Sequence, residues 1–339
     1  MKEILKKLVE ISSPSGREEK VRNLILETIK DHIDDYKIDP LGNLIAHKKG
    51  PGKKLLLDAH MDEIGFLASY IDENGFVRME PVGGHEPMMM PSQRIIFEYG
   101  AIGVFYLESE IVAEKRDNWK NLSFDTLFVD IGATNRNEAL AKVRIGEMAT
   151  FERNFLDMGK RMMSKAMDDR VGCAILIEVI KSIRNPQQDL YFVFAAQEEV
   201  GLVGAKTAAY QVDPDFGIAV DITGSGFLDL PKGAKRIPMK LGAGPAIKIQ
   251  DRSMVASHEL NQFIANTAEK MHIPYQYEVL PFGGTDGGVI QTTKAGVKTT
   301  TLSIPTRYGH SPSEVVDTDD VNHCIQLLLH LAENPITLE

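Results

Sequence analysis

The most constraining feature of this sequence is a change of pattern along the chain. Before Gly65 and again after Met163, apolar runs typical of strands alternate with apolar residues at helical spacing. Between about Gly65 and Phe155, short strand-like runs separated by turn residues follow one another, and few helical patterns intervene. The alternating parts predict an α/β sheet, and the stretch between them predicts a small all-β unit, which we expect to be a barrel.

The division of the chain follows from this change. We expect residues 1–68 together with 163–339 to form one α/β domain that carries the chemistry. Residues 69–162 are expected to be inserted into it as a β-barrel that mediates dimerisation. The sequence shows no internal repeat and no low-complexity segment, so the two expected domains account for the whole chain.

Two local patterns add detail. The run Lys54–Ala59 is almost continuously apolar, as expected of a strand that is buried on both faces of a sheet. Nearer the N-terminus, Ser15 lies three residues before Glu18, which is the spacing of a helix capping box. We therefore expect a buried strand at the first position and a helix start at the second.

The composition excludes several classes of function. The chain has 38 Lys and Arg against 48 Asp and Glu, a net charge of -10, so nucleic-acid binding is not expected. No apolar stretch reaches the roughly 20 residues of a membrane span, and the N-terminus lacks the apolar core of a signal peptide. Cys173 and Cys324 are far apart in the sequence, which favours two buried thiols and a cytoplasmic protein.

Residues that commonly bind metal ions follow apolar strands, or begin a helix, at several separate places. Each has an ordinary structural explanation when taken alone, as a loop residue, a helix cap or a solvated surface residue. In an open α/β sheet, however, ligands bind beyond the carboxyl ends of the strands, where such side chains converge. Together they predict a divalent-metal site that suits Zn or Co. These residues are His60, Asp62, Asp168, Asp169, Glu198, Glu199, Asp221 and His310.

In order and context, these motifs resemble the tetrahedral aminopeptidases of metallopeptidase family 42. The matching stretches are Asp58–Gly65, Lys165–Gly172, Gln197–Gly201, Asp221–Thr223, Gly283–Asp286 and Tyr308–Pro312. The resemblance runs from the first helical pattern to the last. It implies a zinc-peptidase-like domain, in which helices flank a mixed central sheet, with the all-β barrel inserted.

The resemblance also implies a two-metal site and assigns its ligands. One ion would be bound by His60 and Asp221, the other by Glu199 and His310, and both by Asp168. Zn and Co are the ions we expect most.

The resemblance implies that Glu198 is the general base. It also implies that Asp62 hydrogen-bonds His60 without binding the metal itself, which would fix the tautomer of the imidazole. Neighbouring residues of a strand point in opposite directions. Glu198 and Glu199 can therefore serve one site only if the strand has ended and the backbone turns.

Two glycine-rich segments are harder to interpret. Gly283, Gly284, Thr285 and Asp286 are predicted to form a substrate-binding loop, although a plain turn before a helix explains them equally well. Gly83-Gly84-His85 lies in the β insertion, and because the ligand set is already complete we expect a surface or interface loop there.

The function that follows is a metal-dependent aminopeptidase that acts on small peptides. One alternative is a related metal-dependent deacylase or carboxypeptidase, and another is a metal-binding assembly protein without activity. Proteins that resemble this one are often labelled endoglucanases, but glycoside hydrolysis normally uses a carboxylate pair without histidines or metal. The resemblance further implies self-association into a dodecamer built from dimers.

Overall fold

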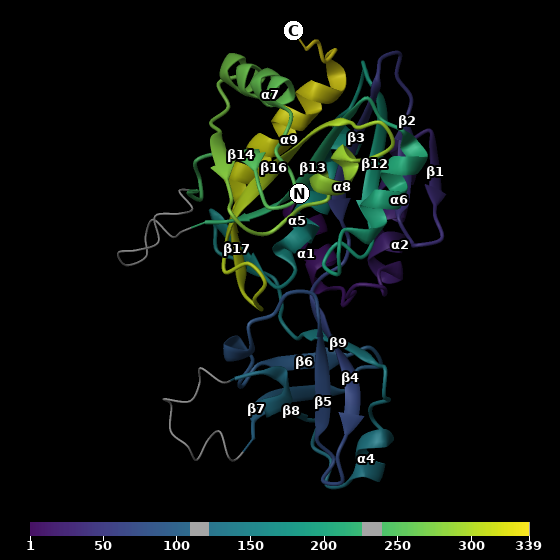
Figure 1. The fold of residues 1–339 in the computed structure, drawn as a ribbon, viewed down its shortest axis with the longest axis vertical. Helices are drawn as coiled ribbons and strands as arrows, with labels where there is room; N and C mark the ends of the chain where they lie inside the picture. The colour runs from purple at the N-terminus through teal and green to yellow at the C-terminus, as the bar shows by residue number, and fades with distance from the viewer. Residues whose placement is uncertain (109–121, 226–238, 339) are drawn as a thin grey trace.

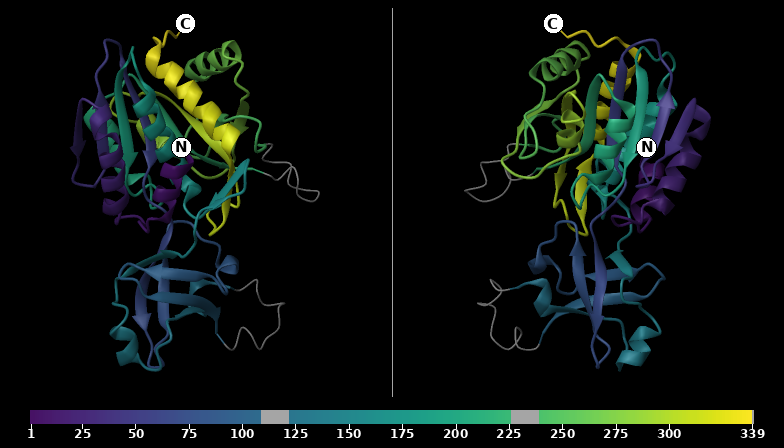
Figure 2. Two further views of the ribbon diagram at one scale, coloured as in Figure 1. Left: turned by 180° about the vertical axis from the view of Figure 1, so that it is seen from behind. Right: turned by 45° about the vertical axis from the view of Figure 1, so that its right-hand side comes forward.

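The computed structural model describes residues 1–108, 122–225 and 239–338. The chain forms a large mixed sheet with helices on both faces and, beyond one end of that sheet, a closed antiparallel barrel (Figure 1). Two further views show the same separation between the two bodies (Figure 2). The predicted fold class is therefore confirmed.

The large sheet is mixed: its central strands are parallel, and the strands toward both ends of its main path pair antiparallel. Its strands are β1 (Asp35–Ile38), β2 (Leu44–Lys48), β3 (Lys54–His60), β10 (Leu156–Asp157), β11 (Arg161–Ser164), β12 (Asp189–Ala195), β13 (Phe216–Gly224), β14 (Ala246–Gln250), β15 (Gln276–Val279), β16 (Lys298–Arg307) and β17 (Glu314–Asp317). Their order is β1-β2-β12-β3-β13-β16-β17-β11-β10, and β14 joins β15 to β16. The strands β12, β3, β13 and β16 are parallel, so their carboxyl ends meet at one edge.

Helices cover both faces of this sheet. They are α1 (Lys2–Glu10), α2 (Glu19–Ile29), α5 (Met167–Ser182), α6 (Val203–Val212), α7 (His258–Lys270), α8 (Gly287–Gln291) and α9 (Thr318–Glu333), with the short 3-10 helix η1 (Lys30–His32) after α2. Helix α5 packs against α1, α2 and α9 on one face, and α6 with α8 packs on the other. Leu55 and Leu57 enter the first core and Leu56 enters the second, which confirms that β3 is buried on both faces. Within the described ranges, no helix has both the length and the apolar character needed to cross a membrane.

The barrel is closed by antiparallel strands around an aromatic core. Its strands, in the order β4-β5-β8-β7-β6-β9, are β4 (Gly65–Ile71), β5 (Val77–Val82), β8 (Leu127–Asp130), β7 (Ile102–Leu107), β6 (Arg94–Phe97) and β9 (Met148–Phe151). Among the described residues of this part are also helix α4 (Arg136–Leu140) and the short 3-10 helices η2 (Pro87–Met89) and η4 (Phe124–Thr126). Phe66 packs against Phe105 and Phe151 with ring centroids 4.8 and 5.2 Å away.

The predicted insertion boundaries fall inside strands. Residue 69 lies within β4, which already belongs to the barrel from Gly65 onward. At the other end, residue 162 lies within β11, and β10 and β11 pair with the large sheet. The short connection between His60 and Gly65 carries no glycine or proline that would mark a boundary in the sequence. The division into domains, and the role of the barrel in dimerisation, stay predictions.

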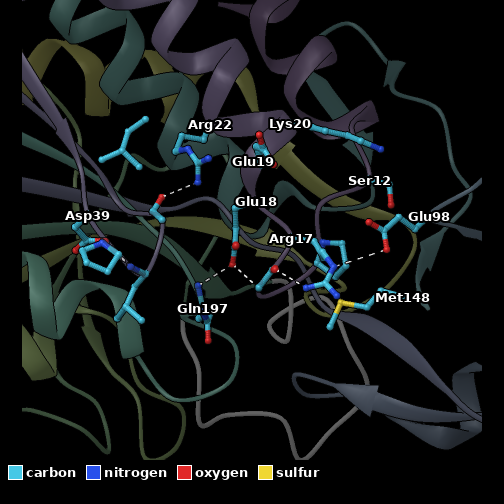
Figure 3. Close-up of a pocket in the computed structure, with 16 residues that line it drawn as sticks. Ser12, Arg17, Glu18, Glu19, Lys20, Arg22, Asp39, Glu98, Met148 and Gln197 are labelled. Carbon is cyan, nitrogen blue, oxygen red and sulfur yellow. Dashed lines mark hydrogen bonds and ion pairs between the residues drawn. The ribbon is translucent and has the colours of Figure 1, made fainter. Parts of the chain in front are cut away.

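The predicted capping box is wrong. Helix α2 begins at Glu19, and Glu18 at its N-cap position makes no side-chain cap. The Ser15 hydroxyl instead donates a hydrogen bond to Asp62 Oδ2 at 2.6 Å. One oxygen of Glu18 accepts hydrogen bonds from the backbone amides of Gly16 and Gln197 at 2.7 and 3.1 Å (Figure 3). Ser15 and Glu18 therefore hold the loops that follow β3 and β12, instead of capping a helix.

Candidate metal centre

The metal-binding residues predicted from the sequence come together at the carboxyl edge of the parallel strands. Residues from β3, the start of α5, the loop after β12, β13 and the loop after β16 line one cavity of about 900 Å³. The lining includes His60, Asp168, Glu198, Glu199, Asp221 and His310. Convergence at one sheet edge, as expected from parallel strands, brings these side chains within reach of a common ligand.

Asp168 lies between the two histidines. Its Oδ1 is 3.1 Å from Nε2 of His60, and its Oδ2 is 3.2 Å from Nε2 of His310. The peptide bond between Asp168 and Asp169 is cis. A carboxylate with one oxygen toward each of two imidazoles has the geometry of a ligand shared by two cations.

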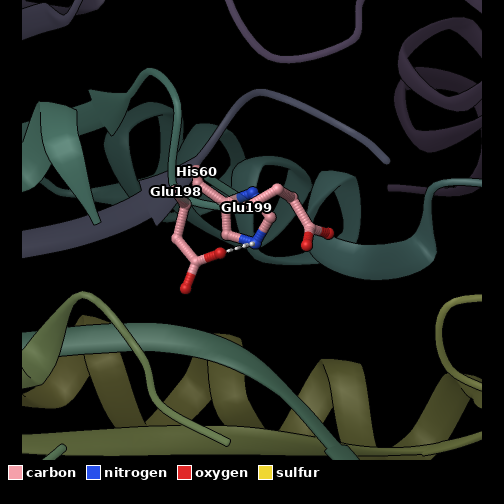
Figure 4. A group of neighbouring side chains, drawn as sticks. All are labelled: His60, Glu198 and Glu199. Atoms are coloured by element: carbon pink, nitrogen blue, oxygen red, sulfur yellow. Dashed lines mark ion pairs between the residues drawn. The ribbon is translucent and has the colours of Figure 1, made fainter. Parts of the chain in front are cut away.

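Three sets of potential ligand atoms lie within 4.8 Å of one another. They are His60 with Asp169 and Asp221; Asp168 with Glu199 and His310; and His60 with Glu198 and Glu199. In the last set, Glu198 Oε2 lies 3.9 Å from Nε2 of His60 (Figure 4). Asp169 is among the residues from which the sequence predicts the site, but the resemblance assigns it no metal. Its Oδ2 accepts a hydrogen bond from the backbone amide of His60 at 3.3 Å.

Asp62 holds the turn that carries both glutamates. Its Oδ1 accepts a hydrogen bond from the Glu198 amide at 3.0 Å, and its Oδ2 accepts one from the Glu199 amide at 3.1 Å. The predicted contact with His60 is longer, with 3.4 Å between Asp62 Oδ1 and His60 Nδ1. The backbone oxygen of Asp62 lies nearer to that nitrogen, at 3.2 Å. Asp62 therefore orients His60 and the two glutamates at once.

Several non-glycine residues near the cavity have a left-handed backbone conformation. Strand β12 ends at Ala195, and Gln197 then has φ 58°, so the backbone turns before Glu198 and Glu199. This turn lets two consecutive carboxylates line the same cavity. Other residues near the site also have positive φ although they are not glycine, namely Ala166, Leu202, Tyr308 and His310. Such conformations are costly and gather at functional sites.

The electrostatics of the cavity fit cations. Burial, reinforced by Asp168, raises the pKa of Glu199 to about 8 and that of Asp221 to about 7. Burial opposes the charged form of His310, but Asp168 and Glu199 outweigh it and raise its pKa to about 11. Among the described residues, Glu199 Oε1 is buried without a hydrogen-bond partner. The carboxylates repel one another, and divalent cations held by this histidine and carboxylate set would relieve that repulsion.

Known proteins are similar to this chain in sequence and in fold. The M42 glutamyl aminopeptidase family profile matches residues 42–327. The chain belongs to the M42 aminopeptidase family. Lysyl aminopeptidase from Pyrococcus furiosus is 38% identical over 98% of this chain and 96% of its own length.

Two solved structures have the same fold along nearly their whole length. An aminopeptidase from the archaeon Desulfurococcus kamchatkensis has a TM-score of 0.91 and 38% identity, covering 98% of this chain and 94% of the other. The TET1 peptidase of Pyrococcus horikoshii, described as able to assemble into a tetrahedron or a large octahedral shell, has a TM-score of 0.87 and 34% identity. That match covers 97% of this chain and 98% of the other.

The predicted substrate loop of this M42 peptidase divides into two parts. Gly283 and Gly284 line the cavity. Thr285 and Asp286 are buried instead, and Thr285 Oγ1 lies 2.9 Å from the hydroxyl of Thr301. Contact of the loop with substrate stays a prediction; Thr285 and Asp286 are not among the residues that line the cavity.

The Gly83-Gly84-His85 segment, which we expected to be a surface or interface loop, reaches the cavity. Gly84 and His85 line the cavity of this M42 peptidase. The His85 Nε2 lies 2.8 Å from the backbone oxygen of Gly65, and burial lowers the pKa of this imidazole to about 4. Sequence spacing could not reveal this position, because the segment reaches the cavity from the barrel.

Glu314, at the start of β17, is a further residue that the sequence reading missed. Its Oε1 accepts a hydrogen bond from the His310 amide at 2.7 Å, and its Oε2 accepts one from the Asp168 amide at 3.0 Å. The side chain is 2% exposed. One carboxylate thus connects the backbone of two residues predicted to bind metal.

We predict that Glu314→Gln weakens metal binding while the chain stays folded. The amide NH₂ group cannot accept a hydrogen bond, so one of the two backbone contacts is lost. Loss of such an outer contact typically costs on the order of 10–100-fold in metal affinity. Competition with a chromogenic chelator measures this. Glu86→Gln is the matched control, because it removes a charge from the same cavity lining but makes neither of these bonds. Equal affinities in the two variants would reject the role.

Proposed function

We propose that this M42 peptidase is a two-metal aminopeptidase that removes the N-terminal residue of small peptides. The position of Asp168 between His60 and His310 carries the proposal, because a carboxylate with one oxygen beside each imidazole could bridge two cations. His60 and Asp221 would hold one ion, and Glu199 and His310 the other. When bound, a pair of divalent cations lowers the pKa of water and stabilises charge that develops on a peptide carbonyl.

Glu198 is proposed as the general base. Its side chain lines the cavity, and the Asp62 carboxylate fixes its backbone amide. A carboxylate in this position would take a proton from water and later deliver it to the leaving amine. Burial, with Asp221 and Asp286 adding repulsion, raises the pKa of Glu198, which increases its basicity.

The cavity itself supports a peptide as the substrate. The Gly283 and Gly284 wall would let a peptide backbone approach closely, because neither residue has a side chain. Met89, Leu280 and Phe282 add apolar surface to the lining. A free α-amine binding near the ions would restrict cleavage to the first residue of the peptide.

A substrate panel tests the proposed activity. We predict hydrolysis of aminoacyl anilides, little hydrolysis of N-acetylated peptides, and none of soluble cellulose. Activity should disappear with a chelator and return when Zn²⁺ or Co²⁺ is restored. Preferred cleavage of N-acetylated substrates would favour a deacylase, and release of C-terminal residues would favour a carboxypeptidase. Metal binding without turnover of any substrate would indicate an assembly protein instead.

The two adjacent glutamates should respond differently to the same change. Glu198→Gln keeps its size but cannot accept a proton, so we predict that kcat falls by about 10²–10⁴ while both ions stay bound. Glu199→Gln should instead weaken the binding of one ion, and excess metal should partly restore its activity. Metal content and kcat of both variants decide the matter. Loss of an ion in Glu198→Gln, or near-normal turnover, would show that the roles are wrongly assigned.

The barrel is proposed as the dimerisation unit of a dodecamer. Its strand β7 alternates buried and exposed residues, and the exposed ones are apolar or aromatic: Ile102, Val104 and Tyr106. A contiguous apolar face of this kind is typical of an interaction site. The assembling TET1 peptidase of Pyrococcus horikoshii shares the fold and supports the same expectation for this chain.

We predict that light scattering at micromolar concentration will show a large assembly. Tyr106→Lys should shift the distribution toward smaller species, because it places a charge in the apolar face. Tyr106→Phe keeps an aromatic ring there and serves as the control. A wild-type monomer in the presence of metal would overturn the proposal, and identical distributions for the two variants would exclude this face.

A further inference from the structure

The two proposed histidine ligands differ in how they are held. The side chain of His60 is 3% exposed, so packing fixes its ring on every side. The side chain of His310 is 42% exposed and lies on a loop whose backbone is left-handed at Tyr308 and at His310 itself. Something other than burial has to set the direction of the His310 ring.

The contact that sets it comes from the barrel part of the chain. The backbone oxygen of Gly84 lies 2.9 Å from Nδ1 of His310. On the other side of the ring, Nε2 faces Asp168 Oδ2 at 3.2 Å and Glu199 Oε2 at 3.5 Å. A carbonyl oxygen only accepts hydrogen bonds, so Nδ1 must be the protonated nitrogen. In the neutral imidazole that a metal ion binds, the lone pair is then on Nε2, which lies on the side of the carboxylates.

The approach requires a residue without a side chain at position 84. A Cβ atom added to Gly84 would lie 2.9 Å from His310 Nδ1 and 3.2 Å from its Cε1. At Gly83, where φ is +83°, a Cβ would meet Glu199 Cβ at 3.2 Å and Oε2 at 3.3 Å. The pair of glycines thus brings the segment against two neighbouring ligand candidates.

His85 anchors this segment to the barrel. Its Nε2 donates to the Gly65 oxygen at 2.8 Å, and its ring lies 4.3 Å from that of Phe66. Phe151 also packs against the ring, with centroids 5.9 Å apart. Since Phe66 and Phe151 belong to the barrel core, the position of Gly84 follows the position of the barrel.

We propose that the backbone carbonyl of Gly84 is a positioning group for His310, which makes the barrel segment 83–85 part of the metal centre. The inference rests on the proposed role of His310 as a ligand. Without this contact the exposed ring of His310 loses the hydrogen bond at Nδ1 that fixes its orientation, and it binds metal less tightly. Metal binding in turn stabilises the docking of segment 83–85 onto the sheet.

The first test compares two alanine variants of the full chain by chelator competition with Co²⁺ and Zn²⁺. Gly84→Ala pushes a methyl group against His310, and we expect one of two ions to bind on the order of 10–100-fold more weakly. The absorption spectrum of the Co²⁺-loaded protein should change with it. Gly284→Ala is the control. It adds a methyl group to the same cavity but meets Ser253 rather than a ligand. Its metal affinity and spectrum should match the wild type, whatever its activity.

A second pair of variants tests the anchor. A glutamine at position 85 retains an N–H that can donate to the Gly65 oxygen, whereas phenylalanine retains only the ring packing. We expect His85→Gln to keep more of the wild-type metal affinity than His85→Phe. The reverse order would contradict the anchoring role.

Hydrogen exchange of the wild-type protein needs no variant and decides the matter if Gly84→Ala does not fold. Peptides covering residues 83–89 should exchange more slowly when metal is added. Unchanged exchange there, or wild-type affinity and spectrum in Gly84→Ala, would overturn the inference. His310→Ala separates this failure from failure of the proposed function. If His310→Ala keeps two full equivalents of metal, His310 is not a ligand and the proposed site itself is wrong.

Discussion

The repulsion among buried carboxylates is the constraint on which the rest of this site depends. The side chains of Asp168, Glu199 and Asp221 are almost fully buried, and repulsion from Asp168 helps to raise the pKa of Glu199 and of Asp221. The imidazoles of His60 and His310, each beside one oxygen of Asp168, offset only part of this repulsion. Burying several carboxylates together destabilises a fold unless cations bind among them. The arrangement therefore makes sense as the protein half of a cation site, and the strained turns around it as the cost of holding that half in place.

Behind the candidate ligands lies a second set of carboxylates that accept hydrogen bonds from backbone amides. Asp62 accepts from the amides of Glu198 and Glu199, and Glu314 accepts from those of Asp168 and His310. Each of these side chains fixes two positions of the chain at once, from elements far apart in sequence. Side-chain direction at the cavity is thus set mainly through the main chain. Loops with left-handed residues would otherwise sample several conformations, so these bonds convert flexible strand ends into a rigid frame.

The sequence carried the architecture and most of the ligand candidates, because both depend on local pattern. Continuous apolar residues in β3 marked a strand buried on both sides, and polar residues just past strand ends marked the cavity. Local pattern also misled: Ser15 and Glu18 have capping spacing, yet they hydrogen-bond to Asp62 and to the Gln197 amide. Glu314 left no signal, because its partners lie 4 and 146 residues away. Contacts set by tertiary packing have no spacing rule that one sequence can reveal.

The contacts between barrel and sheet likewise leave no local pattern in the sequence. By pattern, the barrel is a separate unit with its own aromatic core, and nothing local ties it to the chemistry. In three dimensions Ser12 accepts a hydrogen bond from Thr150, and Arg17 Nε lies 3.7 Å from Glu98 Oε2, so the two bodies meet near the N-terminal turn. Gly84 adds a contact at the cavity itself. An exposed ion pair contributes little to stability, whereas a backbone oxygen directed at a candidate ligand lies where small displacements matter most. The barrel therefore meets the sheet near the N-terminal turn and also reaches the cavity, through one continuous stretch of chain from its aromatic core through His85 to Gly84.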